Sequence, residues 1–104
     1  MKQPATHEAP APDSRALVPD HVVYRSFAHE TVILNLRTGR YHGVNTTGGR
    51  MLDLLTSQRT VGSAAAALAE EYGRPHDEVE RDVLEFCADL ARRGLIELRL
   101  DDAA

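Results

Sequence analysis

The chain contains few side chains of the kinds that bind metals or act as nucleophiles, namely Cys87 and the histidines His7, His21, His29, His42 and His76. No two of these histidines are four residues apart and there is no second cysteine, so the spacing of a helical zinc site is missing. Cys87 lies within a predicted helix, where a small buried thiol is more common than a nucleophile. We therefore predict neither a metal site nor covalent catalysis at these positions.

The other residue combinations that support catalysis are missing as well. The segment Thr47-Gly48-Gly49-Arg50 is rich in glycine, but it lacks the spacing and the lysine of a phosphate-binding loop. No pair of side chains suggests a general acid and a general base. The sequence therefore predicts a protein that is not an enzyme and that needs no cofactor.

Length and charge favour a single small domain. The chain has 104 residues, of which 42% are hydrophobic, with a net charge of -4 and one cysteine, so no disulfide can form within it. No apolar run approaches the roughly 20 residues of a membrane span, and no hydrophobic signal segment opens the chain. These features predict a soluble, cytoplasmic protein without a membrane partner.

Composition divides the chain into two parts. Residues 1–19 contain four of the five prolines and little that could pack, which predicts a disordered N-terminal arm. This arm is either an N-terminal segment without a role or a tail that folds on a partner. Residues 20–100 contain the periodic patterns of a folded domain.

Three short strands are predicted after the arm. Apolar and polar residues alternate over residues 22–27 and 31–36, and the short link between them fits a hairpin. Residues 37–39 form a second hairpin loop, in which Gly39 supplies the positive φ. The third strand runs from Arg40 to Val44, and Gly43 within it indicates a bulge or the close approach of another backbone. If the outer edge of this strand is free, an extended peptide can pair with it.

Three helices follow, bounded by residues that favour helix ends. Asn45 and Thr60 are good N-caps, and Gly73 and Gly94 are typical of C-termini. The second helix is expected over residues 61–72, and the third from Pro75 to about residue 93. Residues 95–100 are expected to cover the core or to add a small strand.

The Gly48-Gly49 pair weakens the first helix by about 1 kcal/mol per glycine relative to alanine. We therefore expect its first turn to lie close against another element. The order of elements predicts an α+β fold that is winged helix-turn-helix-like, with a three-stranded antiparallel sheet followed by three helices.

The third helix carries an apolar stripe beside an acidic face. The stripe consists of Val79, Val83, Phe86 and Leu90, and is flanked by Asp82, Cys87 and Ala91, which could line a groove. Six acidic residues against one internal arginine would repel phosphates, so we predict no nucleic-acid partner. Recognition of a peptide fits this helix better.

Across residues 20–98, hydrophobic, glycine and asparagine positions follow one another in a characteristic order: Ile33-Leu34-Asn35-Leu36, Gly39-Arg40-Tyr41, Val44-Asn45, Gly48, Met51-Leu52, Leu54-Leu55, Thr60-Val61, Leu68, Tyr72-Gly73, Val79, Asp82-Val83, Leu90 and Arg93-Gly94-Leu95-Ile96. This ordered set resembles the PqqD family. The family takes its name from the pyrroloquinoline quinone pathway and includes the precursor-recognition elements of ribosomally made, modified peptides.

The resemblance implies that the leader peptide of a precursor pairs with the third strand and lies in the groove between this strand and the third helix. As a free-standing copy, the chain is similar to the discrete leader-binding proteins of lasso-peptide biosynthesis. Those proteins work beside a separate leader peptidase and a macrolactam-forming cyclase. A radical-SAM enzyme, as in the quinone pathway, is the alternative partner.

From this placement we predict the residues that contact the peptide. Pocket-lining positions are Tyr41, Val44, Val83, Phe86, Cys87 and Leu90, and polar contacts are Arg40, His42 and Asp82, with Gly43 in the pairing strand. Ordinary core packing is the alternative role for the apolar positions. A winged-helix DNA-binding regulator and a structural subunit of an enzyme complex are the alternative functions.

Overall fold

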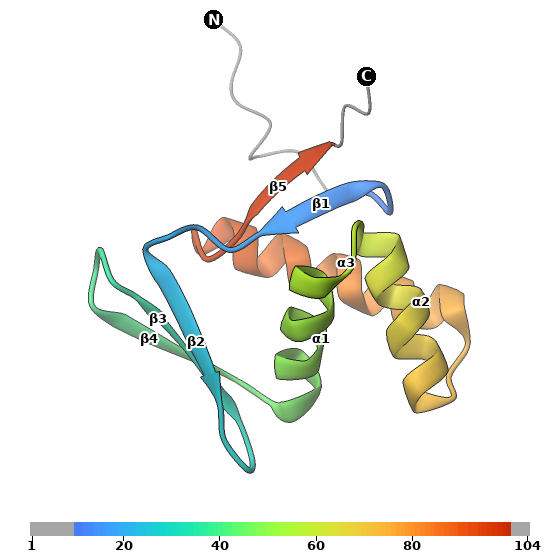
Figure 1. The fold of residues 1–104 in the computed structure, drawn as a ribbon, viewed down its shortest axis with the longest axis horizontal. Coiled ribbons are helices and arrows are strands. Elements are labelled where there is room, and N and C mark those ends of the chain that lie inside the picture. The colour runs from blue at the N-terminus through green and yellow to red at the C-terminus, as the bar shows by residue number, and fades with distance from the viewer. Residues whose placement is uncertain (1–9, 101–104) are drawn as a thin grey trace, which may run out of the picture.

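The computed structural model of the chain describes residues 10–100. Its elements are β1 (Ser14–Leu17), β2 (Val22–Ser26), β3 (Thr31–Asn35), β4 (Arg40–Val44), α1 (Thr46–Ser57), α2 (Val61–Tyr72), α3 (His76–Arg92) and β5 (Glu97–Leu100). The strands β2, β3 and β4 form one antiparallel sheet, and β1 and β5 form a separate two-stranded sheet (Figure 1). The predicted α+β class, with a three-stranded antiparallel sheet followed by three helices, is confirmed.

Alternation along β3 gives the larger sheet a covered face. Thr31, Ile33 and Asn35 are buried on this face, and their cross-strand partners on β4 are Val44, His42 and Arg40. The helix α1 packs against β3 and β4 on the same side. The inward side chains of β4 therefore point toward the helices.

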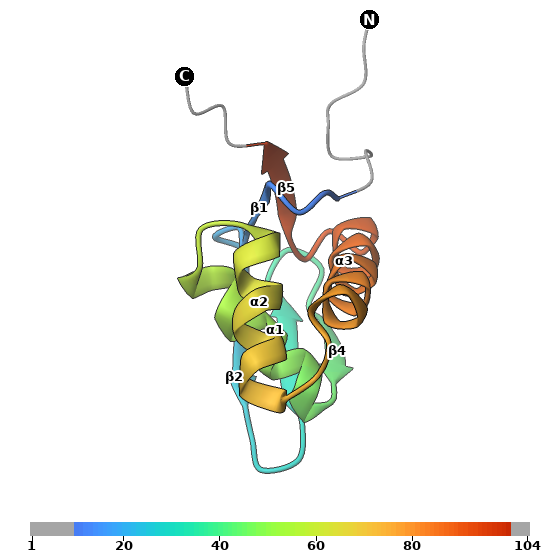
Figure 2. The same cartoon turned by 90° about the vertical axis from the view of Figure 1, so that its right-hand side faces the viewer.

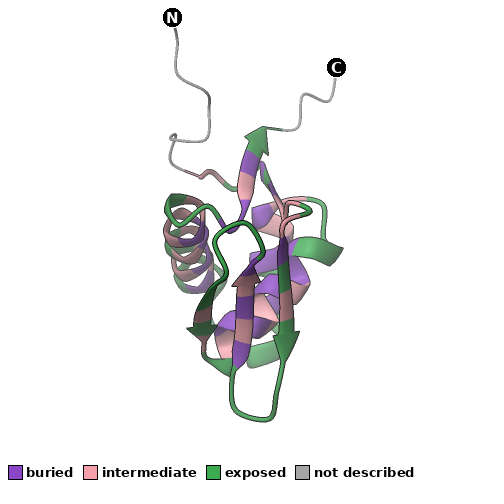
Figure 3. Cartoon of the chain, turned by 90° about the vertical axis from the view of Figure 1, so that its left-hand side faces the viewer, coloured by how far each residue is buried: buried purple, intermediate pink, exposed green. Residues whose placement is uncertain are grey.

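The opposite face of the sheet is open. Val23, Leu34 and Tyr41 lie in one cross-strand row on it, and Tyr41 is 72% exposed. Figure 3 views the molecule from this side and shows all three strands without an element in front of them. Side chains at these positions therefore do not point toward α3.

The small sheet corrects part of the predicted N-terminal arm. Residues 14–17 pair with residues 97–100 in antiparallel register, and Ala16 and Leu98 are buried between the ribbon and the helices. The backbone N–H of Gly62 donates to the carbonyl of Pro12 at 2.7 Å, which holds the start of this ribbon against α2. The proline content indicated disorder, but pairing with β5 orders this stretch. Residues 1–9 lie outside the described part of the chain.

The connection from β4 to α1 is short and tightly bonded. Asn45 caps α1 as predicted, because its Oδ1 accepts a hydrogen bond from the N–H of Gly48 at 2.8 Å. The two glycines do lie against other elements, since a Cβ on Gly49 would overlap Thr31 of β3. The end of β4 and the N-terminus of α1 are therefore fixed relative to each other.

The helix ends follow the predicted signals. Thr60 caps α2 through a reciprocal hydrogen-bonded pair with Ser63, and Gly73 ends it with a φ of 66°. Pro75 is the residue before the first turn of α3. At the other end of this helix, Gly94 follows the C-cap residue Arg93 and has a φ of 74°. The segment after α3 adds the strand β5. Among the described helices, none combines the length and the apolarity needed to cross a membrane.

Candidate functional site

The strand β4 is an edge strand, because within residues 10–100 only β3 pairs with it. Backbone hydrogen bonding alternates between the two sides of an antiparallel strand. The N–H of Leu36 donates to the carbonyl of His21 at 2.6 Å, which shows that the even-numbered residues of β3 bond toward β2. The odd-numbered residues of β3 therefore bond toward β4.

The same alternation identifies the backbone groups at the free edge of β4. Arg40, His42 and Val44 are the partners of the odd-numbered residues of β3, so their N–H and C=O groups bond within the sheet. The N–H and C=O groups of Tyr41 and Gly43 are consequently directed outward. An extended chain could bond to these groups and continue the sheet.

A groove of about 520 Å³ lies along this edge, between β4 and α3. Figure 2 shows α3 running beside β4. The apolar residues that line the groove are Val44, Met51, Phe86 and Leu90. At Gly48, a Cβ atom would lie 3.1 Å from the Cβ of Val44 and 3.2 Å from Cε1 of Phe86. The absence of a side chain at Gly48 therefore keeps this part of the groove open.

Charged side chains border the groove along α3. Asp82, Glu85 and Asp89 line it, and Arg93 lies at one end, where its Nη1 is 3.5 Å from Nδ1 of His42. Asp89 forms ion pairs with Arg92 and Arg93 at 3.3 Å. Glu85 forms no hydrogen bond or ion pair with any described residue. The wall formed by α3 therefore carries a negative charge that no cation within the described part of the chain matches.

The structure brings together six of the ten residues predicted from the sequence. His42, Gly43, Val44, Asp82, Phe86 and Leu90 all line the groove. Val83 and Cys87 do not line it and belong to the core, as does most of Leu90, which is 1% exposed but reaches the floor of the groove. Tyr41 points to the open face of the sheet, and Arg40 is exposed at the start of β4. Both of these residues lie beside the edge rather than in the groove.

Seven further residues line the groove and were missed: Asn45, Thr47, Gly48, Met51, Glu85, Asp89 and Arg93. The α3 members follow Asp82 and Phe86 at helical spacing, so the same helix face already contained the signal. The others surround the N-terminus of α1. That helix end meets the groove because the Asn45 cap directly follows β4.

Burial also defines the chemistry of Cys87. Desolvation raises the pKa of its thiol from the ordinary value of 9.0 to about 12. The thiol is therefore neutral at physiological pH, which is the opposite of an activated nucleophile. Among the described residues, no group of three or more histidine, cysteine, aspartate or glutamate side chains is arranged to hold a metal ion.

Residues 30–96 match the family model for PqqD, coenzyme PQQ synthesis protein D. The structure of TbiB1 in complex with the TbiA(beta) leader peptide is similar to this chain, with a TM-score of 0.71, 33% sequence identity, and coverage of 78% of this chain and 94% of that one. The structure of lasso peptide synthetase B1 complexed with the leader peptide shares the fold, with a TM-score of 0.69, 21% identity, and coverage of 81% and 96%. No curated protein sequence matches the chain.

Proposed function

Because the chain belongs to the PqqD family, as a recognition element for ribosomally made and modified peptides, we propose that it binds the leader peptide of a precursor by β-strand addition to β4. The observation that carries this proposal is the free edge of β4 beside the groove along α3. Tyr41 and Gly43 supply the outward N–H and C=O groups, and α3 forms the wall against which the added strand lies.

Main-chain pairing and groove contacts have different tasks in this mechanism. Each strand hydrogen bond contributes a net of about 0.5–1.5 kcal/mol whatever the sequence of the peptide. Each apolar leader side chain that is buried contributes about 1.5–3 kcal/mol. Selectivity therefore comes from the fit of such side chains against Val44, Met51 and Phe86, with His42 and Asp82 as polar contacts.

The proposed role is binding and presentation, without catalysis by this chain. In the lasso-peptide setting, the bound leader is presented in the cytoplasm to a separate leader peptidase and a macrolactam cyclase. Both structural relatives are complexes with leader peptides, and one of them is a lasso peptide synthetase B1 protein, which supports this setting. The acidic face of α3 speaks against a DNA-binding regulator, because this face would meet phosphates with repulsion.

A peptide selected from a displayed library of random sequences provides the probe for this mechanism. Labelled and titrated with the purified chain, it should bind, whereas labelled duplex DNA should not. Gly43→Pro should weaken peptide binding by about tenfold or more, since proline removes an outward N–H and its ring occupies the edge. Circular dichroism should show that the helices remain folded.

Ser26→Pro is the matched control, because it places the same ring on the other edge of the sheet. Ser26 lies on β2 opposite Thr31, at a position whose N–H points away from β3. Peptide affinity should be unchanged in this variant, and urea unfolding together with the control Ser26→Ala shows how much of any effect comes from loss of the 2.8 Å contact between the Ser26 and Thr31 hydroxyls. Equal affinity of the Gly43→Pro variant and the wild-type chain would overturn strand addition to β4. The pathway is tested separately, by asking whether the selected consensus recurs in a short reading frame beside genes for a peptidase and a cyclase.

A further inference from the structure

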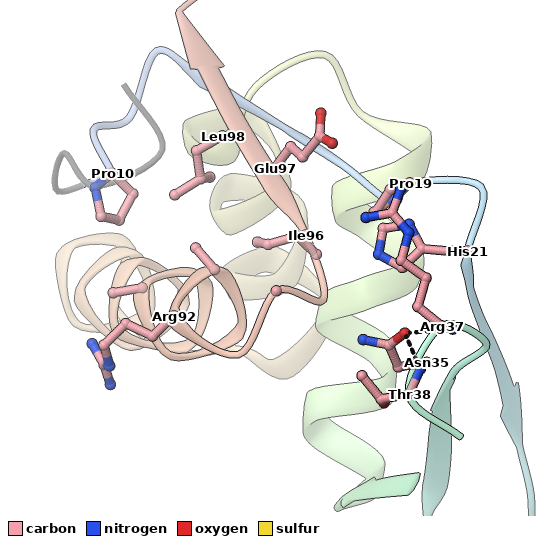
Figure 4. A pocket seen from close by; sticks show the side chains of 13 residues that line it. Pro10, Pro19, His21, Asn35, Arg37, Thr38, Arg92, Ile96, Glu97 and Leu98 are labelled. Carbon is pink, nitrogen blue, oxygen red and sulfur yellow. Dashed lines mark hydrogen bonds between the residues drawn. The ribbon is translucent and has the colours of Figure 1, made fainter. Parts of the chain in front are cut away.

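A second cavity, of about 920 Å³, is lined by a different face of α3 from the groove, and Figure 4 shows the residues around it. It lies between the C-terminal end of α3, the strand β5, the turn between β3 and β4, and the residues Pro10, Pro19 and His21. Ala88, Ala91, Ile96 and Leu98 give it apolar walls. It is therefore large enough, and apolar enough, to receive a side chain from another molecule.

The side-chain amide of Asn35 faces this cavity. Asn35 is 8% exposed, and its Oδ1 accepts hydrogen bonds from the N–H groups of Arg37 at 2.9 Å and Thr38 at 3.4 Å. These two donors fix which end of the amide is the oxygen. The side-chain nitrogen forms no hydrogen bond with any described residue, and Figure 4 shows it directed toward the cavity. No buried side-chain nitrogen or oxygen of the described residues lacks a hydrogen-bond partner, so this nitrogen keeps accessible surface and can donate to an acceptor that enters the cavity.

Among residues 10–100, one cation at the cavity has no ion-pair partner. Glu97 is paired with Arg99 at 3.3 Å, and Arg92 is paired with Asp89 at 3.3 Å. The guanidinium of Arg37 lines the cavity and forms no ion pair or hydrogen bond with the described residues. The cavity therefore combines apolar walls with an amide donor and a free guanidinium, a set that suits an acidic residue in a peptide.

The cavity lies near one end of the proposed path of the leader, although it shares no lining residue with the groove. Leu90 and Arg93 of α3 line the groove, and Ala91 and Arg92 line the cavity. The turn that borders the cavity leads directly into Arg40, the first residue of β4. A strand added antiparallel to β4, the pairing with slightly greater stability, runs from Val44 toward Arg40. The peptide residues that follow the paired stretch are therefore directed toward the turn that contributes Arg37 and Thr38 to the cavity.

We propose that this cavity is a second subsite for the same precursor, which takes the residues immediately C-terminal to the strand-paired segment of the leader. This assignment rests on the proposed function. An acidic side chain of the peptide binds the guanidinium of Arg37, a peptide carbonyl accepts from the amide nitrogen of Asn35, and an apolar side chain packs against Ile96 and Leu98.

Selection of displayed random peptides on the wild-type chain tests the assignment without knowledge of the precursor. The enriched peptides should carry an acidic residue C-terminal to the segment whose binding is lost in the Gly43→Pro variant. Deleting that C-terminal extension from a selected peptide should weaken binding to the wild-type chain by about tenfold. With Arg37→Ala, the full and the shortened peptide should bind equally.

Two further variants separate recognition from folding and from bulk charge. Asn35→Asp keeps the oxygen that accepts from the turn but replaces the amide donor, so it should stay folded and lose affinity for acidic extensions. Arg81→Ala removes the same charge as Arg37→Ala, but from a position outside both the groove and the cavity. This variant should bind the full peptide with the affinity of the wild-type chain.

Each outcome decides between distinct alternatives. In one outcome, Gly43→Pro abolishes peptide binding, but deleting the C-terminal extension of the peptide weakens binding equally in the wild-type chain and in Arg37→Ala. Strand addition then stands and the second subsite is wrong. If no selected peptide depends on Gly43, the proposed function itself fails. If inorganic phosphate alone binds the wild-type chain but not Arg37→Ala, and acidic extensions give no gain, the cavity is a site for free anions and the peptide assignment is overturned.

Discussion

Gly49 of α1 lies so close to Thr31 of β3 that a Cβ on Gly49 would overlap Oγ1 of Thr31 and lie 2.9 Å from its Cβ. Thr31 cannot easily move, because it is 1% exposed and its hydroxyl is 2.8 Å from that of Ser26. This contact sets the distance between α1 and the sheet. It thereby fixes the end of the groove that the N-terminus of α1 forms.

We expect Gly49→Ala to lower the free energy of unfolding by about 1–3 kcal/mol, because overpacking outweighs the better helix propensity of alanine. Urea unfolding of the two proteins measures this difference. Adding Thr31→Ala to the same chain removes the overlapping hydroxyl, so the two substitutions should be non-additive. Simple additivity would show that the contact does not limit the approach of α1 to β3.

Gly48→Ala separates binding from stability. The new Cβ would point between Val44 and Phe86 and narrow the groove, while alanine favours the helix. Because Val44 and Phe86 must shift slightly to admit the Cβ, we expect a smaller loss of stability than in Gly49→Ala, together with a several-fold loss of affinity for a selected peptide. Unchanged affinity would mean that bound side chains do not reach this part of the groove.

The unmatched carboxylate of Glu85 should select peptides with a basic residue facing α3. Glu85→Gln should weaken binding of such a peptide by about two- to fivefold, as expected for an exposed ion pair, and added salt should reduce the difference. Glu70→Gln on α2 makes the same charge change outside the groove and is the control. Equal losses in both variants would indicate a general effect of net charge instead.

The buried thiol of Cys87 predicts a pH dependence of stability. Its pKa is raised from 9.0 to about 12 in the folded chain, so the folded state retains this proton while the unfolded state releases it. The resulting stability is fully present below pH 9 and is lost as the pH rises toward 12, at about 1.4 kcal/mol per pH unit. Cys87→Ala should flatten this decline in urea unfolding experiments between these pH values. Identical slopes would contradict the raised pKa.

Local signals in the sequence were sufficient for most element boundaries. Asn45, Thr60, Gly39 and Gly73 act through hydrogen bonds or backbone angles within a few residues, so their roles can be predicted without the tertiary structure. The pairing of β1 with β5 could not be predicted in this way, because it joins the two ends of the described chain. The prolines of residues 1–19 indicated a disordered arm, and only the tertiary structure shows that β5 is the partner strand of β1.

The groove was predicted in position but not in detail. Helical periodicity places Val83, Phe86 and Cys87 near one another on α3, but it does not tell which side faces the neighbouring helix. In the structure, α3 packs on α2 with Val83 and Cys87 in the core, which leaves Phe86 partly exposed to the groove. Similarly, strand alternation placed His42 and Val44 correctly only once the buried face of β3 was known.

Amide hydrogen exchange, measured by NMR with and without a saturating selected peptide, tests strand addition most directly. The outward N–H groups of Tyr41 and Gly43 should exchange rapidly in the free chain and become protected in the complex. Those of His42 and Val44, which already bond to β3, should change little. Saturation by the peptide without protection of Tyr41 and Gly43 would contradict the account.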